Sequence, residues 1–198
     1  MYLIYDNINN YDENKYNEFY NSLKSCDMAR IKHYIRERDR RLFILSRILL
    51  IRLLKDNYSL DYCNLEIKYN SCNKPYIDNI YFNISHSYDY AVVVSSDKRI
   101  GVDIEKIREV DINIINYFCT NSEKSYILNS KNKYKCLFEI FCLKEAYFKM
   151  LGTDLSNIRD IEFRIDDNGI YCSYNNNLNI ILDYTIDNYV IAVIEEKD

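Results

Sequence analysis

Gly101-Val102-Asp103-Ile104-Glu105 places two carboxylates two residues apart in an otherwise apolar stretch. This alternation predicts a strand whose successive side chains point to opposite faces. We expect Asp103 and Glu105 to share one face with Gly101, which leaves room there for a ligand, while Val102 and Ile104 point into the core. Magnesium is often held by a few carboxylates, waters and phosphate oxygens. An acidic strand can also be an ordinary solvated face, so the assignment depends on a second motif.

The second motif is the segment 141–152, Phe-Cys-Leu-Lys-Glu-Ala-Tyr-Phe-Lys-Met-Leu-Gly. It predicts a helix that places Glu145 between Lys144 and Lys149 and ends at a Gly152 cap. Glu145 and Lys149 are four residues apart and therefore share a helix face, where a surface ion pair alone would also explain them. Taken together, the three carboxylates and two ammonium groups of the two motifs predict a site for a divalent metal and a phosphorylated substrate.

The remaining hydrophobic periodicity predicts a mixed chain of class α+β. In the first half we expect strands at 2–5, 65–69, 81–84, 91–95 and 100–105 and helices at 15–24 and 36–56. In the second half we expect helices at 111–118, 121–130 and 134–150 and strands at 161–165, 170–174, 178–184 and 189–195. Residues 73–76 predict a turn around Pro75, and residues 85–89 predict a polar loop. Each half combines antiparallel strands with helices, which suggests lobes at 1–98 and 99–198.

Composition limits the possible functions. The 198 residues are 48% hydrophobic, which suffices for a core, and the 3 Gly and 1 Pro exclude a flexible linker. Seven Cys without a C-x-x-C pair, and only 2 His, make a zinc site a poor explanation and favour reduced thiols in a cytoplasmic protein. The N-terminus lacks the basic region of a signal peptide, and the longest clean apolar run, Ile48 to Ile51, is too short to span a membrane.

A basic segment stands out in this acidic chain, whose formal net charge is −4. Its cations are Arg30, Lys32, Arg36, Arg38, Arg40, Arg41, Arg47, Arg52 and Lys55. They form either a solvated helix face or a surface for phosphate or an acidic partner. A nucleic-acid binder is a third possibility, but the net charge opposes it, and we expect no nucleic-acid or membrane partner. The hydroxyls and imidazole of Ser85-His86-Ser87 can donate to phosphate, although a lone His is as often structural.

The segments Ile84–Ser87, Gly101–Glu105 and Lys144–Gly152, in this order and spacing, resemble the 4′-phosphopantetheinyl transferases. The length resembles the larger, surfactin-synthetase-activator type, which is Sfp-like. The resemblance covers roughly residues 28–152 and implies two similar α/β lobes, related by a pseudo-two-fold axis, with the active site in the cleft between them. It also implies a reaction that moves the phosphopantetheine arm of coenzyme A to a serine of an apo acyl or peptidyl carrier protein and releases 3′,5′-adenosine bisphosphate.

The resemblance also implies residue roles. Asp103, Glu105 and Glu145 would hold Mg²⁺ on the pyrophosphate, and either Glu123 or Glu145 would accept the serine proton. Lys149 would meet phosphate oxygens beside the reacting centre. The residues that would bind the rest of coenzyme A are Arg30 and Arg47 near the 3′-phosphate, Lys74 and Pro75 near the adenine, and Ser85, His86 and Lys144 at phosphate groups.

Three positions depart from the family pattern: Phe141 replaces a Trp, Asn73 replaces a Gly, and Cys119 replaces a Phe. The last lies in a region that the resemblance implies for carrier contact. A non-catalytic module that binds coenzyme A or a nucleotide is the alternative function, although keeping three acids and two lysines exceeds what binding requires. The two-lobe length suggests that one chain builds the whole cleft, so we expect a monomer.

Overall fold

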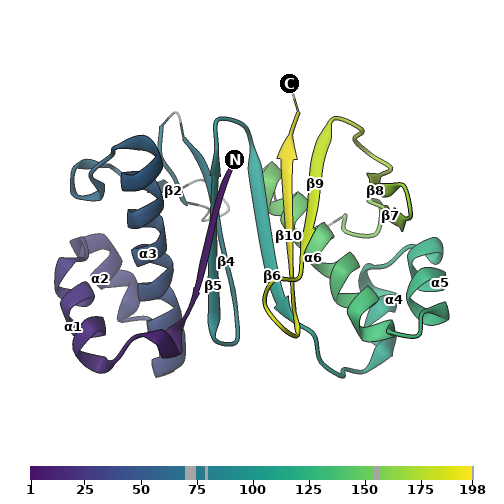
Figure 1. Cartoon of the computed structure of the whole chain (residues 1–198), viewed down its shortest axis with the longest axis horizontal. Helices are drawn as coiled ribbons and strands as arrows, with labels where there is room; N and C mark the ends of the chain where they lie inside the picture. The colour runs from purple at the N-terminus through teal and green to yellow at the C-terminus, as the bar shows by residue number, and fades with distance from the viewer. Residues whose placement is uncertain (70–74, 79, 154–156, 198) are drawn as a thin grey trace.

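The structure is a computed structural model and describes residues 1–69, 75–78, 80–153 and 157–197. Two three-stranded sheets lie side by side in the middle of the molecule, and the main helices cover their outer sides (Figure 1). This mixture of helices and antiparallel sheets confirms the predicted α+β class. Within the described residues, no helix is long and apolar enough to cross a membrane.

The first half is a sheet of order β1-β5-β4, antiparallel throughout, with helix α3 packed on it. Leu45 and Leu49 of α3 are fully buried against Ala91 and Val93, because apolar residues at helical spacing face the sheet. The elements are β1 (Tyr2–Asn7), α1 (Glu13–Ser22), α2 (Ser25–Ile31), α3 (Glu37–Tyr58), β2 (Lys68–Tyr69), β3 (Pro75–Tyr76), β4 (Tyr81–Ser87) and β5 (Tyr90–Ser96), with 3₁₀ turns at Ile8–Asn10 and Tyr62–Asn64.

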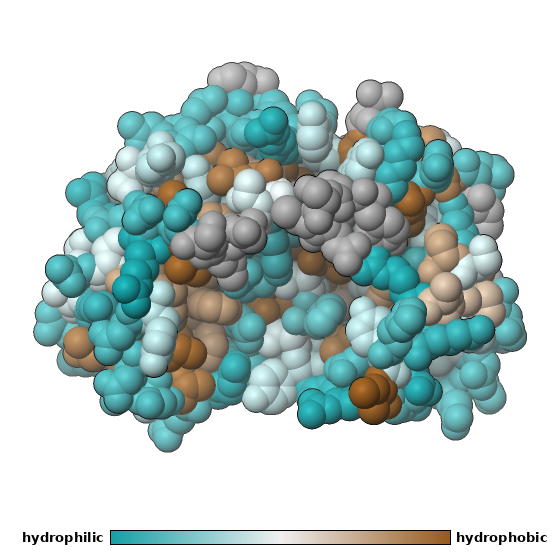
Figure 2. Space-filling view, turned by 180° about the vertical axis from the view of Figure 1, so that it is seen from behind, coloured by the Kyte–Doolittle hydropathy of each residue, from teal (hydrophilic) through white to brown (hydrophobic). Residues whose placement is uncertain are grey.

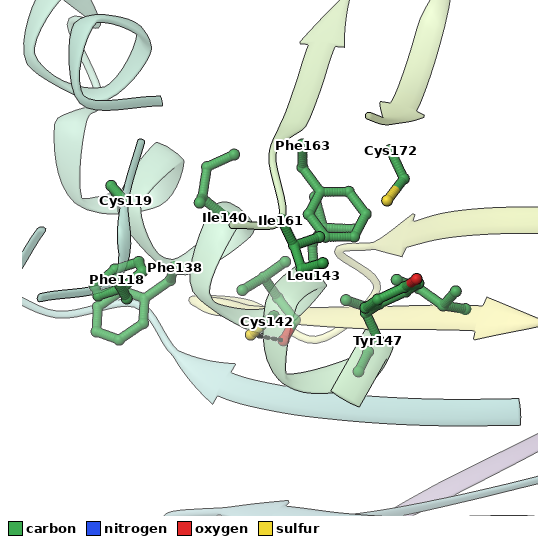
Figure 3. Close-up of a cluster of buried hydrophobic side chains, with 14 of the residues drawn as sticks. Phe118, Cys119, Phe138, Ile140, Cys142, Leu143, Tyr147, Ile161, Phe163 and Cys172 are labelled. Atoms are coloured by element: carbon green, nitrogen blue, oxygen red, sulfur yellow. Dashed lines mark hydrogen bonds between the residues drawn. The ribbon is translucent and has the colours of Figure 1, made fainter. Parts of the chain in front are cut away.

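The second half is a sheet of order β6-β10-β9 with helix α6 packed on it. The elements are β6 (Ile100–Lys106), a 3₁₀ turn (Ile112–Ile114), α4 (Ile115–Phe118), α5 (Asn121–Asn129), α6 (Lys133–Leu151), β7 (Phe163–Asp166), β8 (Gly169–Cys172), β9 (Leu178–Asp183) and β10 (Tyr189–Glu196). Figure 3 shows Leu143 and Tyr147 of α6 among the buried side chains that also include Phe163 and Cys172. The helix ends at Gly152, whose φ of 74° suits the predicted cap.

The two halves share one topology. Each begins with a strand, continues through a long helix and ends with two further strands, and the last strand pairs between the other two. Thus β1, α3, β4 and β5 of the first half correspond to β6, α6, β9 and β10 of the second. The two sheets bury apolar side chains against each other, including Val92 and Val94 of β5, Val102 and Ile104 of β6, and Ile191 and Val193 of β10.

Gly101 corrects one expectation from the sequence. It was expected to leave room for a ligand, but an added Cβ would lie 2.0 Å from the backbone oxygen of Ala146 and 2.5 Å from the backbone nitrogen of Met150. Both atoms belong to α6. The missing side chain therefore lets α6 approach β6 closely, and this approach brings the acidic face of the strand against the helix.

Two further expectations change at the level of elements. Ser85, His86 and Ser87 were expected in a loop, but they continue β4 to its end and pair with β5. Helix α2 was not predicted. In the expected turn at 73–76, residues 73 and 74 lie outside the described residues, whereas Pro75 and Tyr76 pair with β2. Free thiols are present at Cys26, Cys119, Cys136, Cys142 and Cys172.

Candidate active-site cleft

A cleft of about 420 Å³ opens where β4 meets β6 and α6. Its lining residues are Ile84, Ser85 and His86 from β4, Asp103 and Glu105 from β6, and Phe141, Glu145 and Lys149 from α6. Figure 2, seen from behind, shows a largely polar face that is hollowed near its middle, with apolar side chains in separate patches. The cleft thus brings together side chains from the first half and the second half of the chain.

Asp103 lies at the centre of this arrangement and is only 5% exposed. Its Oδ1 accepts a hydrogen bond from the Ser85 hydroxyl at 2.8 Å. The same oxygen forms an ion pair with Lys149, whose Nζ lies 2.6 Å away. Lys149 Nζ also lies 2.9 Å from Ser85 Oγ, which closes a triangle of three polar groups. By contrast, Asp103 Oδ2 is buried and has no hydrogen-bond partner among the described residues.

Ionisation of the other two carboxylates, Glu105 and Glu145, is disfavoured by burial and by neighbouring negative charge. Burial raises the pKa of Glu105, the Asp103 charge adds to the effect, and hydrogen bonds from Ser87 and Arg108 oppose it. Burial also raises the pKa of Glu145, and the charges of Asp103 and Glu105 add to this while Lys149 opposes it. The cleft therefore concentrates more negative charge than its own lysine neutralises.

Lys149 is held as a cation. Burial alone would lower its pKa, but the charge and hydrogen bond of Asp103 outweigh burial, with help from Glu145, and the pKa is raised. Lys149 lies one helical turn after Glu145 on α6, so both side chains reach the cleft from one face. An ammonium group fixed beside three carboxylates can neutralise a phosphate that enters the cleft.

The donor set suits a magnesium ion that shares its shell with substrate. Within the described residues, no group of three or more His, Cys, Asp or Glu is close enough to form a ready-made metal cage. Magnesium does not require one, since it commonly takes one or two carboxylates, several waters and phosphate oxygens. The unpartnered Oδ2 of Asp103 and the raised pKa values of Glu105 and Glu145 are what a cation at this position would relieve.

Two family models match the chain almost end to end. The model described as the 4′-phosphopantetheinyl transferase superfamily matches residues 99–194, and the one described as 4′-phosphopantetheinyl transferase, N-terminal, matches residues 10–98. The chain belongs to the 4′-phosphopantetheinyl transferases.

Individual relatives are distant. The chain is 27% identical over 147 residues to the 4′-phosphopantetheinyl transferase gsp of Aneurinibacillus migulanus. The aligned region covers 73% of this chain and 62% of that protein. It is 25% identical over 130 residues to the 4′-phosphopantetheinyl transferase Sfp of Bacillus subtilis, which covers 63% of this chain and 58% of that protein. The chain thus spans about three fifths of the length of these relatives. The holo-[acyl-carrier-protein] synthase of Thermotoga maritima is similar over 50% of this chain and 63% of its own, at 26% identity and a TM-score of 0.43.

His86 lies on the face of β4 opposite to Ser85 and Ser87. It retains exposed surface in the cleft. Partial desolvation lowers its pKa, and the nearby Lys149 ammonium lowers it further, although Asp39 and Asp103 oppose the shift. A neutral imidazole can still donate one N–H to a phosphate oxygen. Phe141, at the position of the family's Trp, packs edge-on against Phe118 at 5.4 Å between ring centroids.

Lys144 lies away from the cleft, contrary to the phosphate contact expected from the transferase motif. It is fully buried, with Nζ 2.8 Å from Glu123 Oε2. The same ammonium donates to the backbone carbonyls of Phe118, Ile158 and Ile161, at 2.8, 3.0 and 2.6 Å. All its donors are therefore used inside the protein.

Glu123 is equally enclosed, with 1% of its surface exposed. It forms a capping box with Thr120 at the start of α5, and its Oε1 accepts the backbone N–H of Phe163 at 2.9 Å. A carboxylate that is closed to solvent and already has partners on both oxygens offers no access to an incoming serine. The enclosed position of Glu123 thus does not fit its predicted role as the acceptor of the serine proton.

Arg47 is also structural here. It is 2% exposed and pairs with the fully buried Asp27 at 2.8 Å, and the Tyr62 hydroxyl donates to the same carboxylate. This network ties α2 to α3 and to the turn at Tyr62, so Arg47 is not available to the 3′-phosphate. Arg30 is half-buried at the end of α2 and is not among the described residues that line the cleft.

The predicted adenine side adjoins the acidic cleft. Pro75 lines a second hollow of about 400 Å³ together with Phe82 of β4, Arg99, and Met150 and Gly152 at the end of α6. Lys74 lies outside the described residues. Because β4 and α6 border both hollows, an extended ligand could follow these two elements from one hollow to the other.

Sequence reasoning missed Ser87. Its hydroxyl donates to Glu105 Oε2 at 2.9 Å, although it was quoted only as part of a loop motif. The available signal was the alternation of Asn83, Ser85 and Ser87: if the strand is continued to residue 87, these three polar side chains share one face.

Proposed function

We propose that this chain transfers the 4′-phosphopantetheine group from coenzyme A to a serine of an apo acyl or peptidyl carrier protein, with Mg²⁺, and releases 3′,5′-adenosine bisphosphate. The observation that carries the proposal is the buried Asp103, with one oxygen held by Ser85 and Lys149 and the other unpartnered, in a cleft with Glu105 and Glu145. Membership of the transferase family supports the reaction class.

Asp103, Glu105 and Glu145 would hold Mg²⁺, which when bound supplies positive charge at the pyrophosphate and lowers the cost of the developing negative charge. Lys149 would bind a phosphate oxygen from the opposite side, since its ammonium already lies among these acids. Ser85 and His86 would donate hydrogen bonds to phosphate groups from β4. These groups position the substrate, and positioning with charge neutralisation is the main contribution of proteins to phosphoryl transfer.

Glu145 is the better of the two candidates for the base. It lines the cleft, where an incoming serine can reach it, whereas Glu123 is closed to solvent. In this step the serine O–H bond breaks and the proton goes to Glu145, while the serine oxygen forms a bond to the phosphorus that carries the pantetheine arm. The P–O bond of the pyrophosphate bridge breaks at that phosphorus, and 3′,5′-adenosine bisphosphate leaves with the bridging oxygen and its electron pair. Glu123, which is enclosed by its ion pair with Lys144, would support α5 instead.

The alternative is a module that binds coenzyme A or a nucleotide without consuming it. The two functions are separated by chromatographic measurement of coenzyme A and of the nucleotide product, with Mg²⁺, in the presence and absence of apo carrier. The proposed enzyme consumes coenzyme A and forms 3′,5′-adenosine bisphosphate only when carrier is present. A protein that binds coenzyme A and leaves its amount unchanged with every carrier type would support the alternative.

We further propose that the working unit is a monomer. Two topologically equivalent halves already lie in one chain, and β4 of the first meets β6 and α6 of the second at the cleft. Sedimentation of the purified protein should give the mass of one chain, whereas a trimer that dissociates only with loss of activity would contradict a single-chain site.

A further inference from the structure

The seam between β4 and β6 is held by side chains. Each strand lies at an edge of its own sheet. Asn83 Oδ1 accepts the Val102 N–H at 3.1 Å, and Ser87 Oγ accepts the Lys106 N–H at 3.3 Å. Buried backbone N–H groups need acceptors, and those at a sheet edge have no strand beside them. The side chains of β4 therefore supply what the carbonyls of a neighbouring strand would supply.

The two strands are parallel and in a fixed register across this seam. The bonded residues are separated by 19 positions for Asn83 and Val102, by 18 for Ser85 and Asp103, and by 18 for Ser87 and Glu105. A nearly constant separation means that both strands advance in the same direction. One face of β4 thus meets the backbone and the acids of β6 residue by residue.

Ser87 performs two tasks in this register. Its oxygen accepts the Lys106 N–H, which leaves its single O–H to donate to Glu105 Oε2 at 2.9 Å. Arg108 Nη1 lies 3.3 Å from the same oxygen. Oε2 of Glu105 is therefore held by two donors, a serine of the first half and an arginine of the second.

We propose that Ser87 is a positioning residue that holds Glu105 in the orientation in which it binds the divalent cation. This inference rests on the proposed function, because it assumes that Glu105 is a metal ligand. Ser87 is 7% exposed and is not among the described residues that line the cleft, so it acts through Glu105. Hydrogen bonds that orient metal ligands typically contribute about 10- to 100-fold to metal affinity.

Ser96 provides a matched control. It is 1% exposed, its hydroxyl donates to Glu195, and its oxygen accepts the Lys98 N–H at 3.1 Å. Ser96→Ala therefore removes the same two kinds of hydrogen bond, but its carboxylate partner, Glu195, does not line the cleft. Any general cost of losing a buried serine should appear in both Ser87→Ala and Ser96→Ala.

The test is Mn²⁺ titration followed by electron paramagnetic resonance, with thermal unfolding of each variant as the check on folding. We expect Ser87→Ala to raise the Kd for Mn²⁺ about tenfold or more. Ser96→Ala should lower Tm by a similar amount but leave the Kd unchanged. Ser87→Thr keeps the hydroxyl and should bind Mn²⁺ like the wild type. Ser87→Val has the shape of Ser87→Thr but lacks the hydroxyl, and it should behave like Ser87→Ala.

Equal Kd values for wild type, Ser87→Ala and Ser87→Val would overturn the inference, as would a Ser87→Thr variant as weak as Ser87→Val. The Thr and Val pair keeps the comparison possible if Ser87→Ala does not fold. Wild-type protein that binds no Mn²⁺ would be a separate outcome, since it would remove the proposed metal site itself and this inference with it.

Discussion

Asp103 uses only one of its two carboxylate oxygens within the described structure. Ser85 and Lys149 both contact Oδ1, while Oδ2 is buried without a partner. A buried acceptor left without a hydrogen bond costs about 1–3 kcal/mol, and such groups recur at functional sites. The geometry around this one residue is therefore the strongest local argument for a cation in the cleft.

Asp103→Asn should abolish detectable transfer, with a loss of at least about 100-fold in kcat/KM, because the amide cannot neutralise a cation and removes the ion pair with Lys149. The measurement is carrier modification per unit time, with circular dichroism as the folding check. Transfer at the wild-type rate in a folded Asp103→Asn protein would remove Asp103 from the metal site.

Glu145 should make stability depend on pH. Its pKa is raised in the folded protein, so the folded state binds the proton more tightly than the unfolded state. The contribution of Glu145 to stability is then greatest below its unfolded pKa of about 4.5 and is lost as pH rises through its folded pKa. In EDTA, Glu145→Gln should gain stability relative to wild type between about pH 4 and pH 7. The gain should be of the order of 1 kcal/mol or less, since the half-exposed side chain is screened.

Urea unfolding at several pH values measures this difference. A Glu145→Gln curve that stays parallel to wild type across the range would show that Glu145 titrates normally. Added Mg²⁺ should reduce the difference, because a cation favours the ionised form of Glu145 in the folded protein.

At the residue scale, the sequence predicted the cleft better than its surroundings. Asp103, Glu105, Glu145 and Lys149 were predicted from spacing and do line one cleft, although their roles stay predictions. Lys144 precedes Glu145 by one residue and so lies about 100° away around the helix. Helical geometry alone could therefore have separated Lys144 from the face shared by Glu145 and Lys149. The family resemblance instead led to a predicted phosphate contact for Lys144.

Helix α6 connects the cleft to the core. It presents Glu145 and Lys149 to the cleft, and at the same time it places Lys144 in an ion pair with Glu123 that is closed to solvent. The ammonium also joins α6 to carbonyls at the end of α4 and before β7. The motif therefore serves both the site and the stability of the second half.

Lys144→Met should destabilise the protein by about 3–5 kcal/mol, because it leaves the buried Glu123 without its counter-ion. Lys149→Met is the matched control: its side chain is 30% exposed, so we expect a smaller loss of stability but a large loss of transfer. Urea unfolding and the transfer assay together check both. A Lys144→Met protein of wild-type stability that has lost coenzyme A affinity would return Lys144 to the phosphate site.

The contact between β6 and α6 depends on Gly101. An added Cβ would lie 2.0 Å from one backbone atom of α6 and 2.5 Å from another, and neither can rotate away. Gly101→Ala should therefore cost about 3 kcal/mol or more and weaken Mn²⁺ binding, since Asp103 and Glu105 would move with the strand. Thermal unfolding measures the first effect. A fully stable variant would mean that α6 can shift without cost.

At the element scale, periodicity predicted the long helices and central strands well. Helix α3 and helix α6 carry enough apolar residues at helical spacing to identify them. The predicted end of the strand at residue 84 was wrong, since β4 continues to Ser87. The sequence did not indicate this because Ser85, His86 and Ser87 are polar on both faces of the strand. Ser85 and Ser87 on one face meet the acids of β6, whereas His86 lies on the opposite face. The burial pattern of this segment therefore depends on tertiary partners that the local sequence does not contain.

The whole molecule is built from two halves of like topology, and the cleft lies where they meet. The division at residues 98 and 99 that the sequence suggested stays a prediction about domains. What the sequence could not predict is how the two sheets meet, because that depends on Asn83, Ser85 and Ser87 contacting a strand 18 or 19 residues later.

The basic segment at the start of α3 tests how a partner protein approaches. Arg36 is exposed. Arg40 pairs with Glu37 at 3.6 Å and donates from Nε to the Tyr34 carbonyl at 2.9 Å, and both contacts lie at the surface, where an ion pair contributes little to stability. Reversing both charges, Arg36→Glu with Arg40→Glu, should raise the KM for an acidic carrier, most strongly at low salt, and leave coenzyme A affinity unchanged. Steady-state kinetics and calorimetry separate the two. A loss of coenzyme A affinity would assign these residues to the cofactor side.

The central claim is that this cleft catalyses metal-dependent transfer to a carrier protein. The most direct measurement is the intact mass of apo acyl and peptidyl carrier proteins after incubation with the wild-type chain, coenzyme A and Mg²⁺, beside reactions with EDTA and with Asp103→Asn. We predict a gain of one phosphopantetheinyl unit on at least one carrier with wild type and Mg²⁺, and no gain in either control. A wild-type chain that binds coenzyme A but modifies no carrier, or a gain that persists in EDTA and in Asp103→Asn, would contradict the account.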